Sequence, residues 1–480
     1  MRKYHVLVIM ILVLLSPVCS YKEVQAKGNI IGHQNETINF DDKNLEAAIR
    51  EKLNKPKGDI TKGDVKTIEE LTINNKNISS LEGIQYLINL KKLNLMFNNI
   101  SDISPLTSLA SMESLNLGYN KLKDIRPLSS LTGLQELHLQ SSKVTDISPM
   151  ANLKNLKVLD LTFNNITNLQ PLRGLTNLIH LDLYGNKIEE IEPLKSLANL
   201  RELILGMNKI TDIDALKNLS KLRILQLGEN KVTDISSLSS LTDLIDLYLY
   251  GNHIKNISPL KPLKNLVHLL LSDNEITDVS VLGKLDNLKV LMLDGNKIKS
   301  IRGIGNARSL ESLVLSNNEV SSLEELGSLA KLSSLNLGNN KIKSVRPLSS
   351  LTNLRSLNIS NNNISDISPI RSLPGLSLTN IELDGNPLPQ YVFADKLKEK
   401  FILCTLSPYI ISAIKEYYGE FRQYMNEGIL SIEESNGMYK LKVRVVTFVG
   451  PHNPPYGIET LTISEDCSGI KVEDYKHEPG

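Results

Sequence analysis

An asparagine recurs at a constant interval through most of this chain of 480 residues, and the interval is 22 residues, as between positions 98 and 120. The asparagines of the series are Asn98, Asn120, Asn164, Asn186, Asn208, Asn230, Asn252, Asn274, Asn296, Asn318, Asn340 and Asn362. Only Ser142 departs from it, and no insertion interrupts the spacing. The register extends back to Leu71 and forward to Asn386. A fixed period of this length predicts a solenoid of about fifteen stacked coils over residues 71–389.

Each fixed position of the repeated unit has a physical reason, as in "LNLMFNNISDISPL" from Leu93 to Leu106. Two leucines separated by one residue point to the same side of a short strand, where they stack on the equivalent leucines of the next coil. The asparagine amide both donates and accepts hydrogen bonds, so it bridges adjacent coils. Ser142 has a shorter side chain, which predicts a weak rung. The proline presets a turn, so short 3-10 segments are expected opposite the strands, and the stack should curve.

Residues 39–70 precede the repeats and predict a helical cap. Asp41 or Asp42 is placed to cap a helix at its N-terminus. The apolar residues of that helix share one stripe: Leu45, Ile49 and Leu53. Thr61 and Asp64 have the spacing of a second capping box. Such a cap shields the open edge of the first coil from water and from other strands.

Residues 1–26 have the three parts of a secretory signal peptide: a basic start, an apolar run from Val6 to Leu15, and small residues ending at Ala26. The apolar run, about ten residues, is shorter than the roughly 20 that a transmembrane helix needs. Residues 27–38 are interpreted as a linker. The sequence thus predicts a secreted, extracellular protein without a membrane span, and leaves association with the cell surface open.

Residues 390–480 lack the repeat and predict a small α+β domain, large enough for its own core. Two helices are expected, Phe393–Leu403 and Ser407–Met425, with Pro408 in the first turn of the second. Two alternating strands should follow: Tyr439–Val449 and Tyr456–Ser464.

Two cysteines remain after removal of the signal peptide, Cys404 and Cys467, and both fall in this C-terminal domain. In an oxidising compartment an even pair is consistent with a disulfide. Two separate buried thiols are about equally consistent, because the sequence gives no geometry. Both alternatives stay open.

Two features of the sequence are shared with a known family: the recurring pattern N-x-I-x-D-I-x-P-L and a helical cap that contains "GDIT". On these features the region from Ile38 to Pro389 resembles the leucine-rich repeats of the internalins, which are bacterial surface and secreted proteins. The resemblance implies an α/β solenoid, a curved horseshoe with a parallel sheet on its concave side and 3-10 turns on its convex side. It also implies that the concave face grips a protein on a host cell.

The C-terminal domain resembles a different, uncharacterised secreted module found in bacilli. The matching stretches are "LSPYI", "AIKEYYG" and "TFVGPHNPPYG". This resemblance implies no activity.

The residue between the paired leucines should face outward on the concave side. At its two ends this column is mostly polar, but four consecutive coils carry Tyr248, Leu270, Met292 and Val314. With strands about 4.8 Å apart, these side chains form an apolar strip about 15 Å long. A contiguous apolar patch on an otherwise polar surface indicates an interaction site, and tyrosine and methionine are enriched in interface centres.

Further candidate residues surround this strip or lie in the turns near the asparagines. The predicted partner-binding residues are Tyr248, Tyr250, Leu270, Met292, Val314, Tyr184, Phe163, Asp246 and His268. Exposed side chains in other turns are Phe97, Tyr119 and Met207. A monomer with a protein partner is the preferred interpretation, and the alternatives are a head-to-head dimer or partial cover by the C-terminal segment.

Charge and motifs argue against several other functions. Lys+Arg and Asp+Glu number 54 and 53, so the net charge of +1 gives no reason to expect nucleic acid or an anionic membrane as partner. The sequence contains no HExxH, no GxSxG, no phosphate loop and no clustered metal ligands, so we predict no catalytic residues, no metal and no cofactor. His452 and Cys404 would lack a third orienting group as a catalytic pair.

The sequence therefore predicts a secreted, non-enzymatic leucine-rich-repeat protein. It should recognise a macromolecular partner through the concave face, and a host surface protein is one candidate. The alternative is an enzymatic or toxin-like activity in the C-terminal domain, with the solenoid as a targeting arm.

Overall fold

The computed structural model describes residues 35–418, 423–435, 438–448, 457–466 and 469–479 of the chain. The described chain forms two compact units, which divide between Asn164 and Asn165. The predicted signal peptide, His452 and Cys467 lie outside the described residues, and of Cys404 only the backbone is described. The signal peptide therefore stays a prediction, and the choice between a disulfide and two separate thiols stays open.

A helical cap opens the first unit, which confirms this part of the predicted fold. It contains α2 (Lys43–Leu53) and the short α3 (Lys62–Val65). At α3 the Thr61 hydroxyl accepts from the Asp64 N–H at 3.3 Å, and the Asp64 carboxylate accepts from the Thr61 N–H at 2.8 Å. This is the predicted capping box. Thr37 forms a β-bridge with Thr61, so the pairing of the cap includes a residue of the predicted linker.

Asp42 joins the cap to the first coil. One carboxylate oxygen accepts from the N–H groups of Asn44 and Leu45 at 2.9 and 3.3 Å, at the start of α2. The other accepts from the N–H and the hydroxyl of Ser79 at 2.7 and 3.1 Å. Burial opposes ionisation, but the hydrogen bonds from Ser79, Leu45 and Asn44 outweigh it and hold the pKa of Asp42 below its usual value. The Asp42 carboxylate thus caps α2 and also attaches this helix to the first coil.

Each coil of the solenoid contributes one strand, and most coils add a 3-10 turn. The strands of the first unit are β1 (Glu70–Thr72), β2 (Lys92–Asn94), β3 (Ser114–Asn116), β4 (Glu136–His138) and β5 (Val158–Asp160). Its 3-10 turns are η1 (Ile84–Tyr86), η2 (Ser104–Ser108), η3 (Arg126–Ser130) and η4 (Ser148–Asn152). Neighbouring strands pair in parallel with equivalent residues opposite each other, as Leu93 opposite Leu115.

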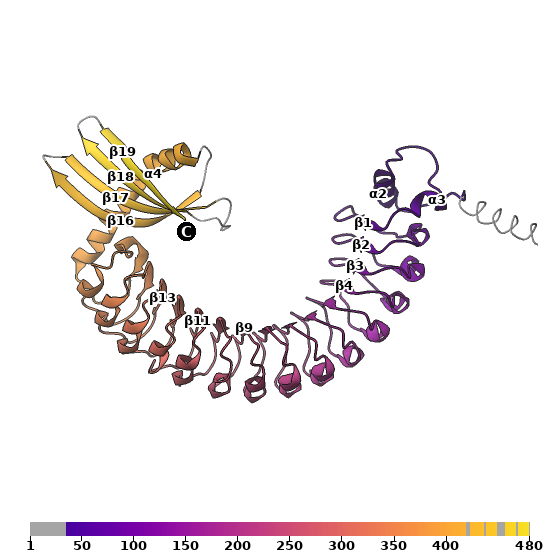
Figure 1. The fold of residues 1–480 in the computed structure, drawn as a ribbon, viewed down its shortest axis with the longest axis horizontal. Helices are drawn as coiled ribbons and strands as arrows, with labels where there is room; N and C mark the ends of the chain where they lie inside the picture. The colour runs from indigo at the N-terminus through magenta and orange to yellow at the C-terminus, as the bar shows by residue number, and fades with distance from the viewer. Residues whose placement is uncertain (1–34, 419–422, 436–437, 449–456, 467–468, 480) are drawn as a thin grey trace, which may run out of the picture. The chain divides into compact units, whose positions relative to one another are not determined.

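The second unit continues the same pattern. Its strands are β6 (His180–Asp182), β7 (Glu202–Ile204), β8 (Ile224–Gln226), β9 (Asp246–Tyr248), β10 (His268–Leu270), β11 (Val290–Met292), β12 (Ser312–Val314), β13 (Ser334–Asn336), β14 (Ser356–Asn358) and β15 (Ile381–Glu382). Its 3-10 turns are η5 (Gln170–Leu172), η6 (Glu192–Ser196), η7 (Asp214–Asn218), η8 (Ser236–Ser240), η9 (Ser258–Leu260), η10 (Ser280–Lys284), η11 (Ile304–Asn306), η12 (Glu324–Ser328), η13 (Arg346–Ser350), η14 (Ser368–Ile370) and η15 (Leu378–Asn380). Within this unit the coils follow an arc with the strands on the inner side (Figure 1).

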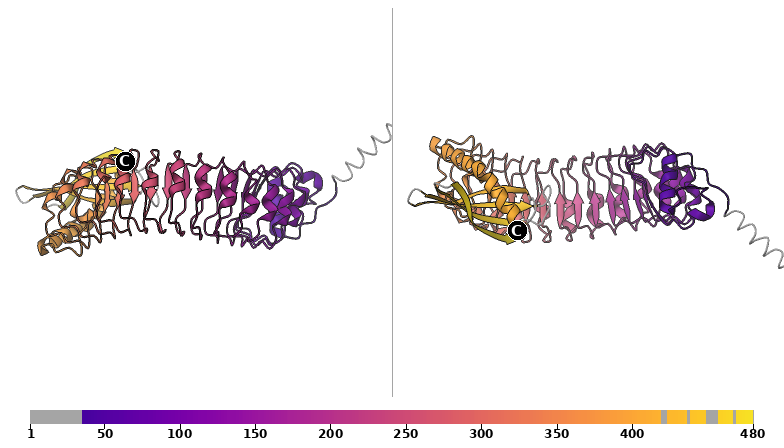
Figure 2. Two further views of the ribbon diagram at one scale, coloured as in Figure 1. Left: turned by 90° about the horizontal axis from the view of Figure 1, so that it is seen from below. Right: turned by 90° about the horizontal axis from the view of Figure 1, so that it is seen from above.

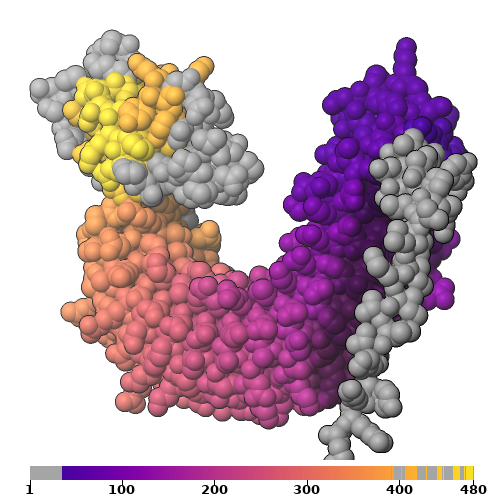
Figure 3. Space-filling model, turned by 45° about the vertical axis from the view of Figure 1, so that its right-hand side comes forward, coloured from indigo at the N-terminus to yellow at the C-terminus, as the bar shows by residue number. Residues whose placement is uncertain are grey.

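The strands and the 3-10 turns lie on opposite faces of the coils (Figure 2). Between them the leucines of the fixed positions fill a continuous core. In the coil of β9, for example, Leu247, Leu249 and Ile254 are 0% exposed. In the space-filling view the coils of the second unit form an unbroken surface (Figure 3). The predicted parallel leucine-rich-repeat solenoid is therefore confirmed.

The asparagines connect each coil to the one before it. The Asn252 amide nitrogen donates to the carbonyls of Leu227 in the preceding coil and Leu249 in its own, both at 3.0 Å. Its oxygen accepts from the Val232 N–H at 2.9 Å. Asn252 is only 4% exposed, so the side chain satisfies backbone groups that water does not reach.

Ser142 makes fewer of these contacts. Its hydroxyl reaches the Leu117 carbonyl at 3.2 Å and the Gln140 carbonyl at 3.3 Å, but a single proton serves one acceptor at a time. Within the described residues, the bond that an asparagine would accept from the Leu122 N–H is missing. Gln140 also has a buried side-chain oxygen without a partner. These observations agree with the weak rung that the serine predicts.

A crevice of about 350 Å³ opens beside this rung. It lies between two coils of the first unit, and its lining includes Leu122, Ile125, Lys143 and Val144. Lys143 has a positive φ of 60°, a conformation that is rare for a lysine. The coils are thus less tightly joined here than at a rung with asparagine.

The C-terminal module, residues 390–479, consists of a long helix, α4 (Gln390–Tyr418), and an antiparallel sheet. The strands in sheet order are β16 (Gln423–Ser435), β17 (Met438–Phe448), β18 (Gly457–Asp466) and β19 (Gly469–Pro479). Among the described helices, α4 included, none combines the length and the apolar character needed to cross a bilayer.

Two details predicted for this module are wrong. Pro408 does not begin a second helix, because it lies inside the continuous α4. The proline removes one helical hydrogen bond, but Leu406, Ile410 and Ile414 pack on the sheet at helical spacing and offset that loss. The helix also does not extend to Met425, since β16 starts earlier and its backbone pairs with β17. Two of the four strands, β16 and β19, were not predicted.

We expect Ser142→Asn to stabilise the first unit. The amide would accept from the Leu122 N–H and donate to a second carbonyl, which should raise the free energy of unfolding by about 1 kcal/mol. Urea unfolding followed by circular dichroism measures the change. Asn120→Ser, at the same position of the preceding coil, is the matched control and should lower stability by about 1–3 kcal/mol. A serine-to-asparagine variant with unchanged or reduced stability would contradict the weak rung.

Asp42→Ala should lower the free energy of unfolding by about 1–2 kcal/mol at neutral pH, because a helix cap is lost. The pKa of Asp42 in the folded chain lies below the usual value of an aspartate, so the stabilisation from its carboxylate is present above that usual value and is lost as pH falls through the lowered pKa. The difference from the unmodified chain should therefore shrink in acid. Asp41→Ala, in which an exposed neighbour is removed, should change little. An equally large effect of that control would show that Asp42 has no special role.

Candidate functional site

Four apolar side chains stand on consecutive strands of the second unit. In the register of β9 to β12, Tyr248 lies opposite Leu270, Leu270 opposite Met292, and Met292 opposite Val314. All four are half-buried, whereas the leucines that precede them point inward and are 0% exposed. At about 4.8 Å per strand they form a ridge about 15 Å long, here called the apolar strip. The alternation explains why one side of each strand is leucine and the other is not.

Two glycines create room for a tyrosine pair next to the strip. A Cβ atom on Gly228 would lie 2.5 Å from the ring of Tyr250, and one on Gly206 would lie 2.8 Å from the ring of Tyr184. Each ring therefore lies against a glycine of a neighbouring coil. Burial, followed by the nearby phenol of Tyr184, raises the pKa of Tyr250. Both tyrosines were predicted from the sequence, but the two glycines were not. Their signal in the sequence is their position directly after the second leucine of the strand.

A polar pair borders the strip. The Asp246 carboxylate lies 2.5 Å from Nδ1 of His268, across β9 and β10. Burial, followed by the charge of Asp246, raises the pKa of Tyr248, so this phenol stays a neutral hydrogen-bond donor. The strip thus has an apolar centre with donors and acceptors at its edge.

The most exposed of the predicted aromatic residues lie in turns of the first unit. Phe97 and Tyr119 are 49% and 41% exposed, and their rings stack with centroids 4.3 Å apart. Phe163 is 50% exposed. All three have positive φ, between 51° and 58°, where most other coils carry glycine, asparagine or aspartate. Bulky residues in this conformation store strain, which often accompanies a functional position.

The structure brings some of the predicted residues together and separates others. Tyr248, Leu270, Met292 and Val314 are contiguous, and Asp246 and His268 adjoin them. Tyr184 and Tyr250 approach each other over the two intervening coils. Phe163 belongs to the first unit. The strip, its polar pair and the tyrosine pair therefore form the candidate site, and all of them belong to the second unit.

This scaffold is a leucine-rich-repeat solenoid, and the family comparisons agree. Six segments match "Leucine Rich repeats (2 copies)": residues 154–196, 176–218, 198–239, 220–262, 264–306 and 308–350. Residues 330–388 match "Leucine rich repeat", and residues 40–165 match the leucine-rich-repeat domain of the endo-β-N-acetylglucosaminidase EndoS. Residues 398–479 match "Protein of unknown function (DUF3888)", so the resemblance of this module to one in bacilli stays a prediction. No curated protein matches the chain.

Solved structures show which leucine-rich-repeat proteins this chain resembles. The internalin InlF of Listeria monocytogenes is 33% identical, with 70% of this chain and 94% of that chain covered and a TM-score of 0.60. A leucine-rich-repeat protein of Leptospira interrogans is also 33% identical, with 66% and 84% covered and a TM-score of 0.63. The plant peptide hormone receptor RGFR1, solved in complex with RGF2, shares the fold at 23% identity, with 68% and 57% covered and a TM-score of 0.59. The chain belongs to the internalin-like leucine-rich-repeat proteins.

In Gly228→Ala the new methyl group should displace the ring of Tyr250. Because the end of the ring can swing outward, the variant should fold at a cost of about 1 kcal/mol. Tyr250 should then react faster with tetranitromethane, which mass spectrometry of the nitrated peptides would show. Gly338→Ala changes the same repeat position, where the nearest side-chain atom is the Asn358 amide oxygen at 3.0 Å, and should leave tyrosine reactivity unchanged. Equal nitration in both variants would argue against the glycine-supported pair.

Proposed function

We propose that this protein is secreted and binds a macromolecular partner through the concave face of its second unit, and a host surface protein is one candidate for that partner. The apolar strip is the main observation that supports this proposal. The same column is polar on both sides of it, at Gln226 and at Asn336. A contiguous apolar surface of this kind marks an interaction site. The signal-peptide pattern of residues 1–26 and the internalin relatives support secretion and binding.

The site has the composition of an interface centre with a polar rim. Tyrosine, leucine and methionine supply apolar area, and its removal from water favours association, although the entropy cost of binding offsets part of this gain. The neutral Tyr248 hydroxyl and the Asp246–His268 pair supply hydrogen bonds that fix the orientation of the partner. A partner with an apolar ridge about 15 Å long, such as one face of a helix, would fit the strip.

The proposal includes an extracellular location, with attachment to the cell surface as the alternative, and a monomeric chain. It requires no metal, cofactor, nucleic acid or membrane span. The apolar centre and polar rim recognise a protein by surface complementarity, for which the side chains of the candidate site suffice.

A second candidate function is an enzymatic or toxin-like activity of the C-terminal module, with the solenoid as its targeting arm. Glu459 is the relevant group, because it is fully buried beside His477, whose Nδ1 lies 3.2 Å from both carboxylate oxygens. However, one of these oxygens also accepts from the hydroxyls of Tyr418 and Thr447, at 2.6 and 2.8 Å. A carboxylate this enclosed stabilises the module core and offers no free base to a substrate. The geometry therefore favours binding.

The test is a pull-down from host-cell surface extracts and from bacterial envelope. The bait is the mature chain, compared with a variant that carries Tyr248→Ser, Leu270→Ser and Met292→Ser. Loss of central interface residues costs about 1–2 kcal/mol each, so recovery of the partner should fall at least tenfold. A control with Asn336→Ser and Asn358→Ser, in the same column beyond the strip, should retain capture. Circular dichroism checks that all three baits are folded.

Equal capture by the unmodified chain and the strip variant, or capture by neither, would remove the strip from consideration. Attention would then move to the C-terminal module, where an enzymatic activity that is lost on substitution of Cys404 or His452 would support the second candidate.

A further inference from the structure

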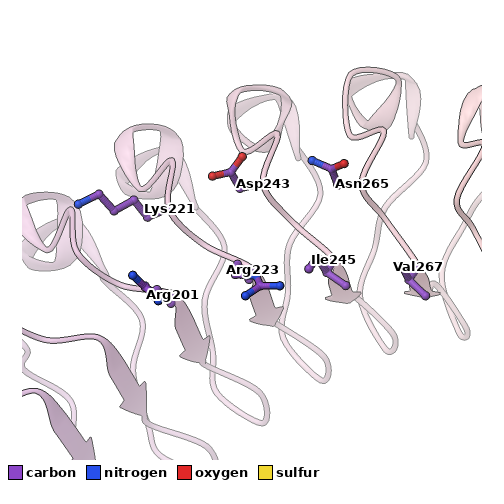
Figure 4. Close-up of a pocket in the computed structure, with 7 residues that line it drawn as sticks. All are labelled: Arg201, Lys221, Arg223, Asp243, Ile245, Asn265 and Val267. Carbon is purple, nitrogen blue, oxygen red and sulfur yellow. The ribbon is translucent and has the colours of Figure 1, made fainter.

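A groove of about 420 Å³ lies on the flank of the second unit, where the chain enters strands β7 to β10. Two rows of side chains line it (Figure 4). Arg201, Arg223, Ile245 and Val267 stand at the starts of four successive strands. The second row comes from the turns before them: Lys221, Asp243 and Asn265. None of these residues belongs to the candidate site above.

The arginines break a pattern of charge pairing. Elsewhere in their column charges pair between neighbouring coils, as with Lys289 and Glu311, whose charged atoms are 3.0 Å apart. Arg201 and Arg223 instead follow each other on adjacent coils, about 4.8 Å apart along the stack. Within the described residues neither guanidinium has an ion-pair partner. Like charges on adjacent strands repel each other, so an anion between them would lower the free energy of this surface.

Acidic side chains near the arginines do not supply that anion. The Glu202 carboxylate is 2.8 Å from Nδ1 of His180 and is engaged there. Asp243 lies in the groove one coil beyond Arg223, where it would repel an incoming anion. An anionic group is therefore directed to the end of the groove formed by Arg201, Arg223 and Lys221.

The other end of the groove is apolar. Ile245 and Val267 are half-buried and continue the row of the arginines. Their centre lies about two coils, or about 10 Å, from the arginine pair. An extended peptide advances about 3.3 Å per residue, so this distance corresponds to about three residues. Guanidinium groups bind carboxylates through paired N–H donors. Ile245 and Val267 can pack against an aliphatic side chain.

We propose that this groove binds an extended peptide segment of a protein, in which an acidic residue and an apolar residue are about three positions apart. The carboxylate lies between Arg201 and Arg223, and the apolar side chain covers Ile245 and Val267. A sulfated glycan would satisfy the arginines but would leave the apolar end uncovered. The groove is a binding surface in addition to the apolar strip, so each can be removed without the other.

The test uses a displayed library of random dodecapeptides. Peptides are selected on the mature chain, with removal of those that also bind the double variant Arg201→Glu, Arg223→Glu. We expect enrichment of sequences with the predicted spacing of acidic and apolar residues. A selected peptide, measured by fluorescence polarisation, should bind the double variant at least tenfold more weakly and Val267→Ser several-fold more weakly. Its affinity should be unchanged by the three strip substitutions.

Lys91→Glu combined with Lys157→Glu is the matched control, since it changes the charge by the same amount in the same column outside the groove. The peptide should bind this control like the unmodified chain. Equal weakening in the control would show a general charge effect and overturn the proposal. Enriched peptides without an acidic residue would also overturn it, as would binding of heparin at the arginines without enrichment of any peptide.

Discussion

The contact on which the rest of the structure depends is the buried amide of the asparagine that recurs in nearly every coil. In the coil of β9 that amide contacts three backbone groups, two of them in the preceding coil. Without it, these N–H and C=O groups would be buried without partners, at a cost of about 1–3 kcal/mol each. The leucines supply the apolar area that drives stacking, but apolar contacts have no preferred direction and do not define the position of one coil on the next. The amide fixes how far one coil is displaced from the next.

A fixed displacement turns the surface of the solenoid into columns of equivalent positions. Along a column the backbone is nearly constant, so a change of function needs only a change of side chains. The apolar strip and the arginine pair are two examples on the second unit, in different columns. The tyrosine pair is a third, and it depends on two successive glycines in a column where most other coils carry a side chain. The exposed side chains of a column can therefore vary without disturbance of the core.

The 22-residue period made the solenoid, the inward leucines and the composition of the strip predictable. It fixes which residues of each strand face the core, because a shift of one residue would expose every core side chain. The approach of Tyr184 and Tyr250 was not predictable, since it depends on ring orientations over Gly206 and Gly228 rather than on a pattern. The continuous helix through Pro408 was mispredicted for a related reason. Local preference disfavours a proline there, but packing of the helix on the sheet outweighs that preference.

The uninterrupted spacing has a consequence for how such a chain can change its length. Loss or duplication of one whole repeat would leave every asparagine opposite its proper backbone partners, since each amide contacts only its own coil and the one before. Surfaces on either side of the change would move by one strand spacing, about 4.8 Å, with a small rotation. The separation between two recognition surfaces on the same unit can therefore be adjusted only in whole steps. In this architecture one 22-residue repeat of the sequence corresponds to one fixed step along the stack.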